Sequence, residues 1–417
     1  MKNKVVITGM GAVSPIGLDA ASSFKAAIDG VCGISLAECF DAELTGIRVA
    51  GQVKDFDPAQ YITKREQKRM ARFTLFAMTA ALQAWEQSGM EGSGFDDERV
   101  GVILGSGMGG LDTICEQYDE LKLNGPRSVS SLFIPKCIIN TTAGQISIRL
   151  GLHGICLSVV TACSTGTDAI GQALYAVREG RMDAVLVGGA ESVMNELAVQ
   201  GFHQMQAITE SADPNRASIP FDKDRSGFVM GEGAAFMLIE SEEHAKKRSA
   251  KILGEVAGYA QTCDAYHITA PQPEGKYAAR AMELAIEDAG IDKTQVGYVN
   301  AHGTSTPLND VGESAAIELC FDDHAKQLLV SSTKSMTGHM LGAAGAFEAV
   351  ITAMALSEGI APPTIGLETE GEGCNLDYVK GKARKMDTSY AISNSFGFGG
   401  HNSCVVLAKT QGQETLC

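Results

Sequence analysis

Two segments of the chain repeat one pattern, in which an apolar, β-branched run ends at a polar turn and an Ala/Gly-rich helix follows. The first segment, residues 158–166, leads into a helix that ends near Gly180, and the second, residues 330–339, leads into one that ends near Gly359. Such a repeat is typical of a duplicated strand–turn–helix unit. It predicts two related halves that pack closely, with turns from both halves contributing to a single site.

Strand-like and helix-like runs alternate along the rest of the chain, which predicts an α/β fold with mostly parallel, buried strands. The expected strands are residues 4–8, 99–104, 156–160, 184–187, 252–259, 296–300, 328–332 and 390–393. The expected helices are residues 73–88, 138–150, 167–179, 276–289 and 341–357. The charged segment at 240–251 is the expected boundary, giving halves of residues 1–250 and 251–412.

Composition excludes some functions and points to a compartment. The net charge of −16 argues against a nucleic-acid binder, and an acidic partner would need a local basic patch. The 11 cysteines include no CxxC pair, which favours reduced thiols in a cytoplasm. No apolar run has the length of a membrane span and the N-terminal apolar run is too short for a signal peptide, so we expect no membrane insertion and no secretion.

Cysteine and histidine side chains follow several of the expected strands. Cys163 directly precedes a predicted helix, where unpaired N–H groups and the helix dipole favour a thiolate. An isolated cysteine most often fills a core. His302 follows the strand at 296–300, however, and Lys334 and His339 stand at the second repeated turn. Because ligands bind at strand carboxyl ends in doubly wound sheets, these four residues are candidates for one site.

A glycine-rich turn, residues 394–402, follows the last expected strand. Its consecutive glycines allow backbone N–H groups to approach a ligand closely. With this turn, seven segments in order resemble a type II β-ketoacyl-[acyl carrier protein] synthase of the thiolase fold. The matching segments are residues 6–17, 161–163, 220–225, 227–233, 302–307, 332–339 and 396–400.

The resemblance implies a fold and a reaction. The fold is a duplicated α-β-α-β-α layered architecture with two mostly parallel mixed sheets, in a homodimer whose interface lies near the strand at 156–160. The reaction is decarboxylative Claisen condensation of malonyl-[acyl carrier protein] with an enzyme-bound acyl thioester, giving 3-oxoacyl-[acyl carrier protein] in fatty-acid elongation. The acyl carrier protein is the expected partner, and no cofactor is required beyond its phosphopantetheine arm.

Three alternative functions remain beside this interpretation. The same chemistry could serve a polyene or polyketide pathway. A non-catalytic subunit that sets chain length typically has Gln in place of the nucleophile, whereas this chain keeps Cys163. A degradative thiolase acting on coenzyme A would have a second cysteine where this chain has Phe398.

The resemblance also implies roles for individual residues. Cys163 would carry the acyl chain, His302 and His339 would stabilise the enolate formed on decarboxylation, and Lys334 would hold the electrostatics around them. The backbone N–H groups of Cys163 and Phe398 would form an oxyanion hole, with the Phe398 ring as a gate to the acyl pocket.

The remaining implied sites surround this centre. Substrate would contact Met108, Phe133, Phe202, Thr304, Thr306, Phe396 and Phe398. The carrier protein would dock on Arg65, Lys68 and Arg69, while Gln206 stands where relatives often have a basic residue. A monovalent cation would bind at Asn300, Glu348, Ser393 and Asn394.

Overall fold

The computed structural model describes residues 3–410, and ten of its strands form one large sheet. In chain order these are β1 (Val5–Val13), β4 (Val100–Gly105), β5 (Cys156–Val159), β6 (Ala184–Glu191), β7 (Gly233–Ser241), β8 (Gly254–Cys263), β9 (Val296–Asn300), β10 (Leu329–Ser331), β13 (Tyr390–Gly397) and β14 (His401–Ala408). Two small hairpin-like sheets pair β2 (Ser35–Leu36) with β3 (Val49–Ala50) and β11 (Ile360–Ala361) with β12 (Arg384–Lys385).

The large sheet consists of two five-stranded sets with one topology. In the first set β5, β4 and β6 are parallel, and β7 and β1 follow as antiparallel strands. In the second set β10, β9 and β13 are parallel, and β14 and β8 are antiparallel. The expected duplication in a mixed α/β fold is therefore present.

One detail of the expected architecture needs correction. The sets are not separate sheets, because β1 pairs with β8 in antiparallel register and joins them. Within each set the expected mostly parallel arrangement holds, because four strands run in one direction and only β7 or β14 is reversed. Both faces of β7 and β14 are buried. A strand buried on both faces reads as one apolar run whatever its direction, so the sequence pattern does not report it.

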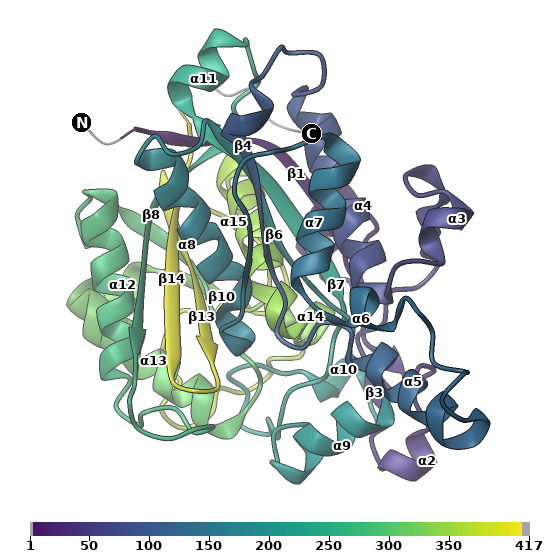
Figure 1. Ribbon diagram of the computed structural model, residues 1–417. Coiled ribbons are helices and arrows are strands. Elements are labelled where there is room, and N and C mark those ends of the chain that lie inside the picture. The colour runs from purple at the N-terminus through teal and green to yellow at the C-terminus, as the bar shows by residue number, and fades with distance from the viewer. Residues whose placement is uncertain (1–2, 411–417) are drawn as a thin grey trace.

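Helices cover both outer faces of the sheet and fill the space between the two sets. The longer helices are α1 (Ala20–Asp29), α4 (Arg72–Ser88), α5 (Leu111–Asn124), α7 (Asn140–Leu150), α8 (Thr165–Arg178), α9 (Glu196–Gln204), α12 (Lys276–Ala289), α13 (Pro307–Phe321) and α15 (Ala344–Glu358). The short ones are α2 (Ala42–Thr45), α3 (Lys64–Gln67), α6 (Phe133–Cys137), α10 (Pro214–Ala217), α11 (Glu242–Lys247) and α14 (Lys334–Thr337). Figure 1 shows α8 and α15 in the middle, with α12 and α13 outside one set and α4 and α7 outside the other.

Alternation along the inner strands builds these layers. On β7, Met237 and Ile239 pack with the central helices, whereas Phe236 and Leu238 pack with α4. This is the period-two pattern of a strand with both faces covered. Helix α15 is buried at every position except its last. The position of α15 explains why its surface has no polar stripe.

The burial of α15 also corrects one sequence expectation. Within residues 3–410, the segment Leu341–Glu358 is long and apolar enough to cross a membrane, with a mean hydropathy of 1.2. In the fold 94% of this segment is buried, as in the core helix of a globular protein.

Most of the expected elements lie where the pattern placed them. The strand at Val296–Asn300 and the helix at Lys276–Ala289 agree residue for residue. Strand β5 differs, because it is an edge strand bonded only to β4, and Leu157 is 42% exposed rather than buried. We propose residues 1–250 and 251–412 as the two halves; residues 411 and 412 lie outside the described part of the chain.

Candidate active site

The structure brings the candidate side chains together at the carboxyl ends of parallel strands. Cys163 lies in a 3₁₀ turn, Ala162–Ser164, between β5 and the start of α8. Ala162 has a φ of +53°, so the turn holds a non-glycine residue in the left-handed region immediately before Cys163. A Cβ on Gly397 would lie 2.8 Å from the Thr161 carbonyl oxygen, and only glycine lets β13 pass this close to the turn.

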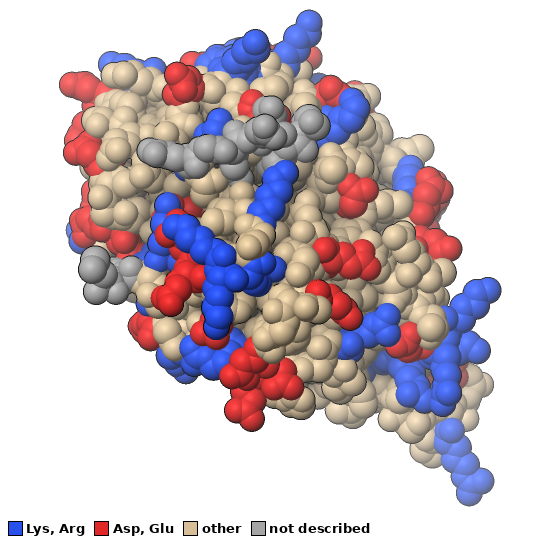
Figure 2. Space-filling model, turned by 90° about the horizontal axis from the view of Figure 1, so that it is seen from above, with Lys and Arg blue, Asp and Glu red and all other residues tan. Residues whose placement is uncertain are grey.

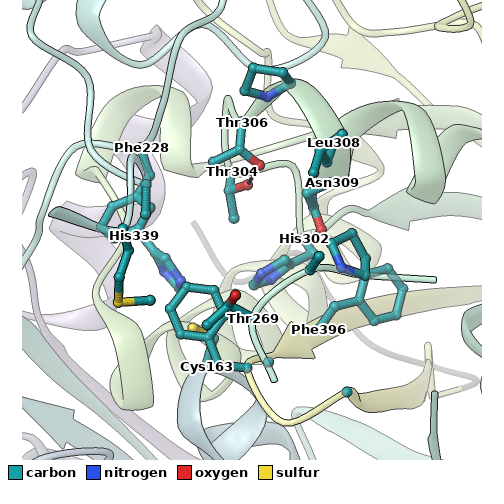
Figure 3. Close-up of a pocket in the computed structure, with 18 of the residues that line it drawn as sticks. Cys163, Phe228, Thr269, His302, Thr304, Thr306, Leu308, Asn309, His339 and Phe396 are labelled. Carbon is teal, nitrogen blue, oxygen red and sulfur yellow. Dashed lines mark hydrogen bonds between the residues drawn. The ribbon is translucent and has the colours of Figure 1, made fainter. Parts of the chain in front are cut away.

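The two histidines face one another across a shared space. His302 follows β9 and His339 follows α14, and their ring centroids are 5.3 Å apart with the planes nearly perpendicular. Figure 3 shows both rings pointing into one cavity, with Cys163 beneath them and Thr304 and Thr306 above. Cys163, His302 and His339 are all buried. One half thus supplies the sulfur and the other supplies both imidazoles.

The environment of Cys163 favours the protonated thiol. Burial raises the pKa of Cys163 to about 11, although the charge of Lys334 and the backbone N–H groups of Phe398 and Cys163 act in the opposite direction. The expectation of a thiolate at the helix N-terminus was therefore wrong, because burial raises the pKa more than Lys334 and the two N–H groups lower it. Both N–H groups expected to form the oxyanion hole approach the sulfur.

Both histidines are neutral in this environment. Burial and the charge of Lys334 hold the pKa values of His302 and His339 well below the usual range. The Leu341 N–H donates to His339 Nδ1 at 3.3 Å, so the proton of the neutral ring is on Nε2. Within residues 3–410, His339 Nε2 has no hydrogen-bond partner. It is a donor available to a ligand in the cavity.

Lys334 lies behind the histidines and is paired. It is 1% exposed, and its ammonium group donates to Glu348 Oε1 on α15. Burial raises the pKa of Glu348 to about 7, with the charge of Lys334 opposing that rise. The Lys334 ammonium group provides a fixed positive charge that acts on Cys163 and both histidines without touching the cavity.

The cavity has a polar wall and an apolar wall. Its volume is about 360 Å³, and Thr304 and Thr306, with hydroxyl oxygens 2.9 Å apart, line the polar side. Phe396 and Phe398 line it near Cys163. Phe202 is half-buried in the apolar cluster around Cys163, with its ring centroid 6.4 Å from that of Phe398. The Phe398 ring therefore lies between the cavity and this cluster.

Two expected substrate contacts do not reach the cavity of this chain. Met108 is 38% exposed in the loop after β4, and Phe133 is half-buried at the start of α6. Neither lines the cavity around Cys163. Exposed apolar side chains follow Phe133 in the chain, with Ile134 55% and Ile138 40% exposed.

The expected cation site divides into two parts. Asn300 Oδ1, Glu348 Oε2 and Ser393 Oγ are buried oxygens without a hydrogen-bond partner in the described chain, and they lie on the α15 side of the sheet. Three such oxygens fit a hard cation. Asn394 follows Ser393 on the strand, so its side chain points to the other face, where it donates to Glu313. The Asn394 side chain therefore lies apart from the other three.

The basic residues expected to bind a carrier protein form a free positive surface. Arg65, Lys68 and Arg69 are exposed on and after α3, and in the part of the chain that the structure describes none of them forms an ion pair. Figure 2 shows Lys and Arg side chains gathered along the right-hand edge, on which Figure 1 places α3.

Several residues at the site have no role in the sequence interpretation. Phe228 lies within a matching segment but had no assigned function; its ring is edge-on to His339 at 5.2 Å. Glu313 accepts the backbone N–H groups of His302 and Gly303, both at 2.8 Å. Glu191 accepts four hydrogen bonds behind the cavity. No sequence signal marks the two glutamates, because a buried carboxylate and a solvated one have the same letter.

Both halves of the chain match domains of one known protein family. Residues 2–245 match the family described as "Beta-ketoacyl synthase, N-terminal domain", and residues 253–368 match "Beta-ketoacyl synthase, C-terminal domain". The 3-oxoacyl-[acyl-carrier-protein] synthase 2 of Coxiella burnetii is 46% identical over 98% of this chain and 99% of its own length. The protein of the same name from Vibrio harveyi is 47% identical over the same shares.

Solved structures share the fold over nearly the whole chain. A β-ketoacyl synthase from Burkholderia phymatum has a TM-score of 0.90 and 34% identity, covering 99% of this chain and 100% of its own. A type II polyketide ketosynthase in complex with its acyl-carrier protein has a TM-score of 0.90 and 30% identity, covering 98% and 100%. The expected thiolase-like ketosynthase fold is confirmed.

Proposed function

The chain belongs to the β-ketoacyl synthase family, and from that premise we propose that it is a 3-oxoacyl-[acyl carrier protein] synthase of fatty-acid elongation. It would condense malonyl-[acyl carrier protein] with an acyl group held on Cys163. The observation that carries this proposal is the single cavity in which one half places a buried thiol and the other places two neutral imidazoles.

In the first step the enzyme acquires the acyl chain. The sulfur of Cys163 attacks the thioester carbonyl of an acyl carrier, the carrier thiol leaves, and the thiol proton departs with it. Negative charge on the tetrahedral oxygen would be stabilised by the backbone N–H groups of Cys163 and Phe398. The same two groups lower the pKa of the sulfur in the structure.

In the second step a carbon–carbon bond forms. His302 and His339 would donate hydrogen bonds to the malonyl thioester oxygen, so that carbon dioxide leaves and its bonding electrons form an enolate. The enolate carbon attacks the acyl carbonyl on Cys163, and the sulfur leaves to complete the 3-oxoacyl product. Neutral imidazoles suit this role because they keep an N–H to donate.

Charge behind the cavity would support both steps. Burial and the charge of Lys334 would together keep both imidazoles neutral. Asn300, Glu348 and Ser393 would hold a monovalent cation, which would add a fixed positive charge beside the Lys334–Glu348 pair. We assign no other cofactor, since the substrates arrive on phosphopantetheine.

We infer that the active form is a homodimer. Apolar side chains are exposed around the edge strand β5, with Ile148 83% and Val160 55% exposed. A second copy covering this face would enclose Met108 and Phe133, the expected pocket residues that one chain leaves open. Sedimentation analysis distinguishes the dimer from a monomer.

We also propose that Arg65, Lys68 and Arg69 bind the acidic carrier protein. Reversing charge at Lys68 and Arg69 should raise the KM for carrier-bound substrate by about tenfold and leave that for a short thioester mimic unchanged. Lys251→Glu, at a distant exposed lysine, is the matched control. An equal change for both substrates would exclude the docking role.

Sequence identity favours primary fatty-acid synthesis over a specialised pathway. The fatty-acid enzymes are 46% and 47% identical, whereas the ishigamide ketosynthase/chain length factor is 31% identical with a TM-score of 0.92. The ten cysteines in the described residues form no disulfide, as suits a cytoplasmic enzyme.

Mass spectrometry of the acyl-enzyme tests the function. The protein is incubated with carrier proteins loaded with graded acyl chains, and the adduct on the Cys163 peptide is measured. Adducts that convert to 3-oxoacyl product on addition of malonyl carrier support the proposal. Absence of an adduct with every carrier-bound chain contradicts it.

A further inference from the structure

Glu191 is a buried carboxylate that the proposed chemistry does not use. It ends β6, is fully buried, and accepts hydrogen bonds on both oxygens. Oε1 accepts from the Ser106 hydroxyl at 2.9 Å and from Met108 N–H at 3.1 Å. Oε2 accepts from Gly107 N–H at 2.7 Å and from Gly342 N–H at 3.1 Å.

The donors to Glu191 come from both halves of the protein. Ser106, Gly107 and Met108 form the loop after β4, whereas Gly342 lies in the 3₁₀ turn Leu341–Ala343 that precedes α15. Three of the four donors are backbone N–H groups, which cannot reverse to accept. Both oxygens must therefore remain acceptors for the contact to persist.

The turn held by Glu191 also fixes His339. Leu341 has a φ of +47°, so the turn is in a conformation that a non-glycine residue adopts only when surrounding contacts hold it. In that conformation the Leu341 N–H reaches His339 Nδ1 and places the ring proton on Nε2, which faces the cavity. The next residue, Gly342, donates to Glu191.

We propose that Glu191 is a positioning residue for decarboxylation: by holding Gly342 it keeps the Leu341 N–H on His339 and so maintains the tautomer that donates into the cavity. This inference rests on the proposed role of His339. The carboxylate acts through the turn and touches no reacting atom.

The test is Glu191→Leu, which keeps a side chain of similar size and removes the acceptor from all four donors, including the Gly342 N–H. In ¹⁵N-histidine-labelled protein, we expect His339 to lose its single Nε2–H tautomer while His302 keeps its signals, with His339→Asn giving the assignment. Malonyl decarboxylation should fall about 10- to 100-fold, as for a misplaced catalytic group.

The rate of Cys163 alkylation is a second readout, and we expect it to rise while the rate of decarboxylation falls. The charge of Glu191 raises the pKa of Cys163, so its removal should speed alkylation of Cys163 at a fixed pH below 9. A general loss of packing would not produce a more reactive thiol together with weaker decarboxylation. Glu240→Leu is the matched control, because Glu240 is equally buried but bonds Arg248, His244 and Thr8 at the other end of the sheet.

The possible results distinguish failure of the role inferred for Glu191 from failure of the role proposed for His339. An unchanged His339 tautomer in a folded Glu191→Leu protein would overturn the role inferred for Glu191, as would equal losses in acylation and decarboxylation. A changed tautomer with normal decarboxylation would support the positioning and contradict the role of His339. If Glu191→Leu does not fold, Glu191→Asp keeps the charge with a shorter reach and should show the same tautomer change.

Discussion

The turn before α8 and the turn before α15 are equivalent in geometry and opposite in chemistry. Each is a single 3₁₀ turn that runs directly into a buried helix, and each begins with a non-glycine residue at positive φ, Ala162 at +53° and Leu341 at +47°. Cys163 thus corresponds in position to Gly342. One half keeps a reactive side chain there and the other has none.

The space around Gly342 explains the missing side chain. A Cβ at this position would lie 2.4 Å from the Gly107 nitrogen and 2.7 Å from Glu191 Oε2. The helices that follow also meet at glycine, since a Cβ on Gly166 would lie 2.6 Å from the Ala346 nitrogen. The contact between the halves therefore leaves room for a side chain in one turn only.

The second half supplies some of its reactive side chains from the segment that precedes the turn at Leu341. Between β10 and the turn at Leu341 the chain inserts α14 and the residues around His339, which have no counterpart between β5 and Ala162. Lys334 and His339 both belong to this insertion. The two halves share one framework, and the site is asymmetric because this segment is present in only one of them.

The asymmetry predicts that loss of the thiol separates the two steps of the reaction. Cys163→Ala should reduce elongation by more than about 10³-fold, because no other group can carry the acyl chain. It should retain malonyl decarboxylation, which depends on the inserted segment and His302. Product analysis with labelled malonyl carrier measures both, and elongation by the variant would contradict covalent catalysis.

The reverse dissociation is expected for the imidazoles. His302→Ala or His339→Ala should each reduce decarboxylation by about 10²–10³-fold, the usual effect of removing one donor to a developing oxyanion. Transfer of an acyl group to Cys163 should persist, as seen by the mass of the adduct. If the acyl adduct disappears instead, the histidines act on the thiol and the division of labour between the halves is wrong.

The sequence predicted the strand–turn–helix framework of both halves, but it did not predict which residues of the two turns correspond. Aligned by residue type, the first turn matches the segment with Lys334 and His339, because both follow a strand and contain Ser, Thr and Gly. Aligned by the start of the helix, Cys163 matches Gly342. Only backbone conformation distinguishes the two alignments, and residue types do not encode it uniquely.

Other properties of the site could not be predicted from the sequence, because they depend on what the fold buries and what it leaves exposed. Cys163, His302 and His339 were found because their segments carry a family pattern, and the structure brings them together. Whether the thiol is ionised depends on burial, which reversed the expectation from the helix dipole. Met108 and Phe133 cannot be placed at the cavity from one chain, because an uncovered face lies beside them.

A steric test of the comparison uses Gly342→Ala. Because the added Cβ meets backbone and a carboxylate at close range, the variant should lose about 1–3 kcal/mol of unfolding free energy in denaturant titration. Gly201→Ala is the control, since this exposed helical glycine on α9 has nothing within 4 Å of an added Cβ. The control should gain about 0.5–1 kcal/mol. Equal stability for both variants would remove the steric reason for the asymmetry.

The pH dependence of Cys163 alkylation distinguishes a buried thiol from a pair with a histidine base. With a pKa near 11, the thiolate fraction and the alkylation rate should rise about tenfold per pH unit from pH 6 to 9. The pH range of the experiment ends at 9 because the folded protein holds the Cys163 proton more tightly than the unfolded chain, in which the pKa of the thiol is near 9.0. Above that pH the contribution of the thiol to stability declines. The rate is followed on the Cys163 peptide by mass spectrometry, with exposed Cys263 as internal reference. A plateau between pH 6 and 8 would show an imidazole taking the proton, and the two turns would then form a nucleophile–base pair instead of separate sites for acyl transfer and decarboxylation.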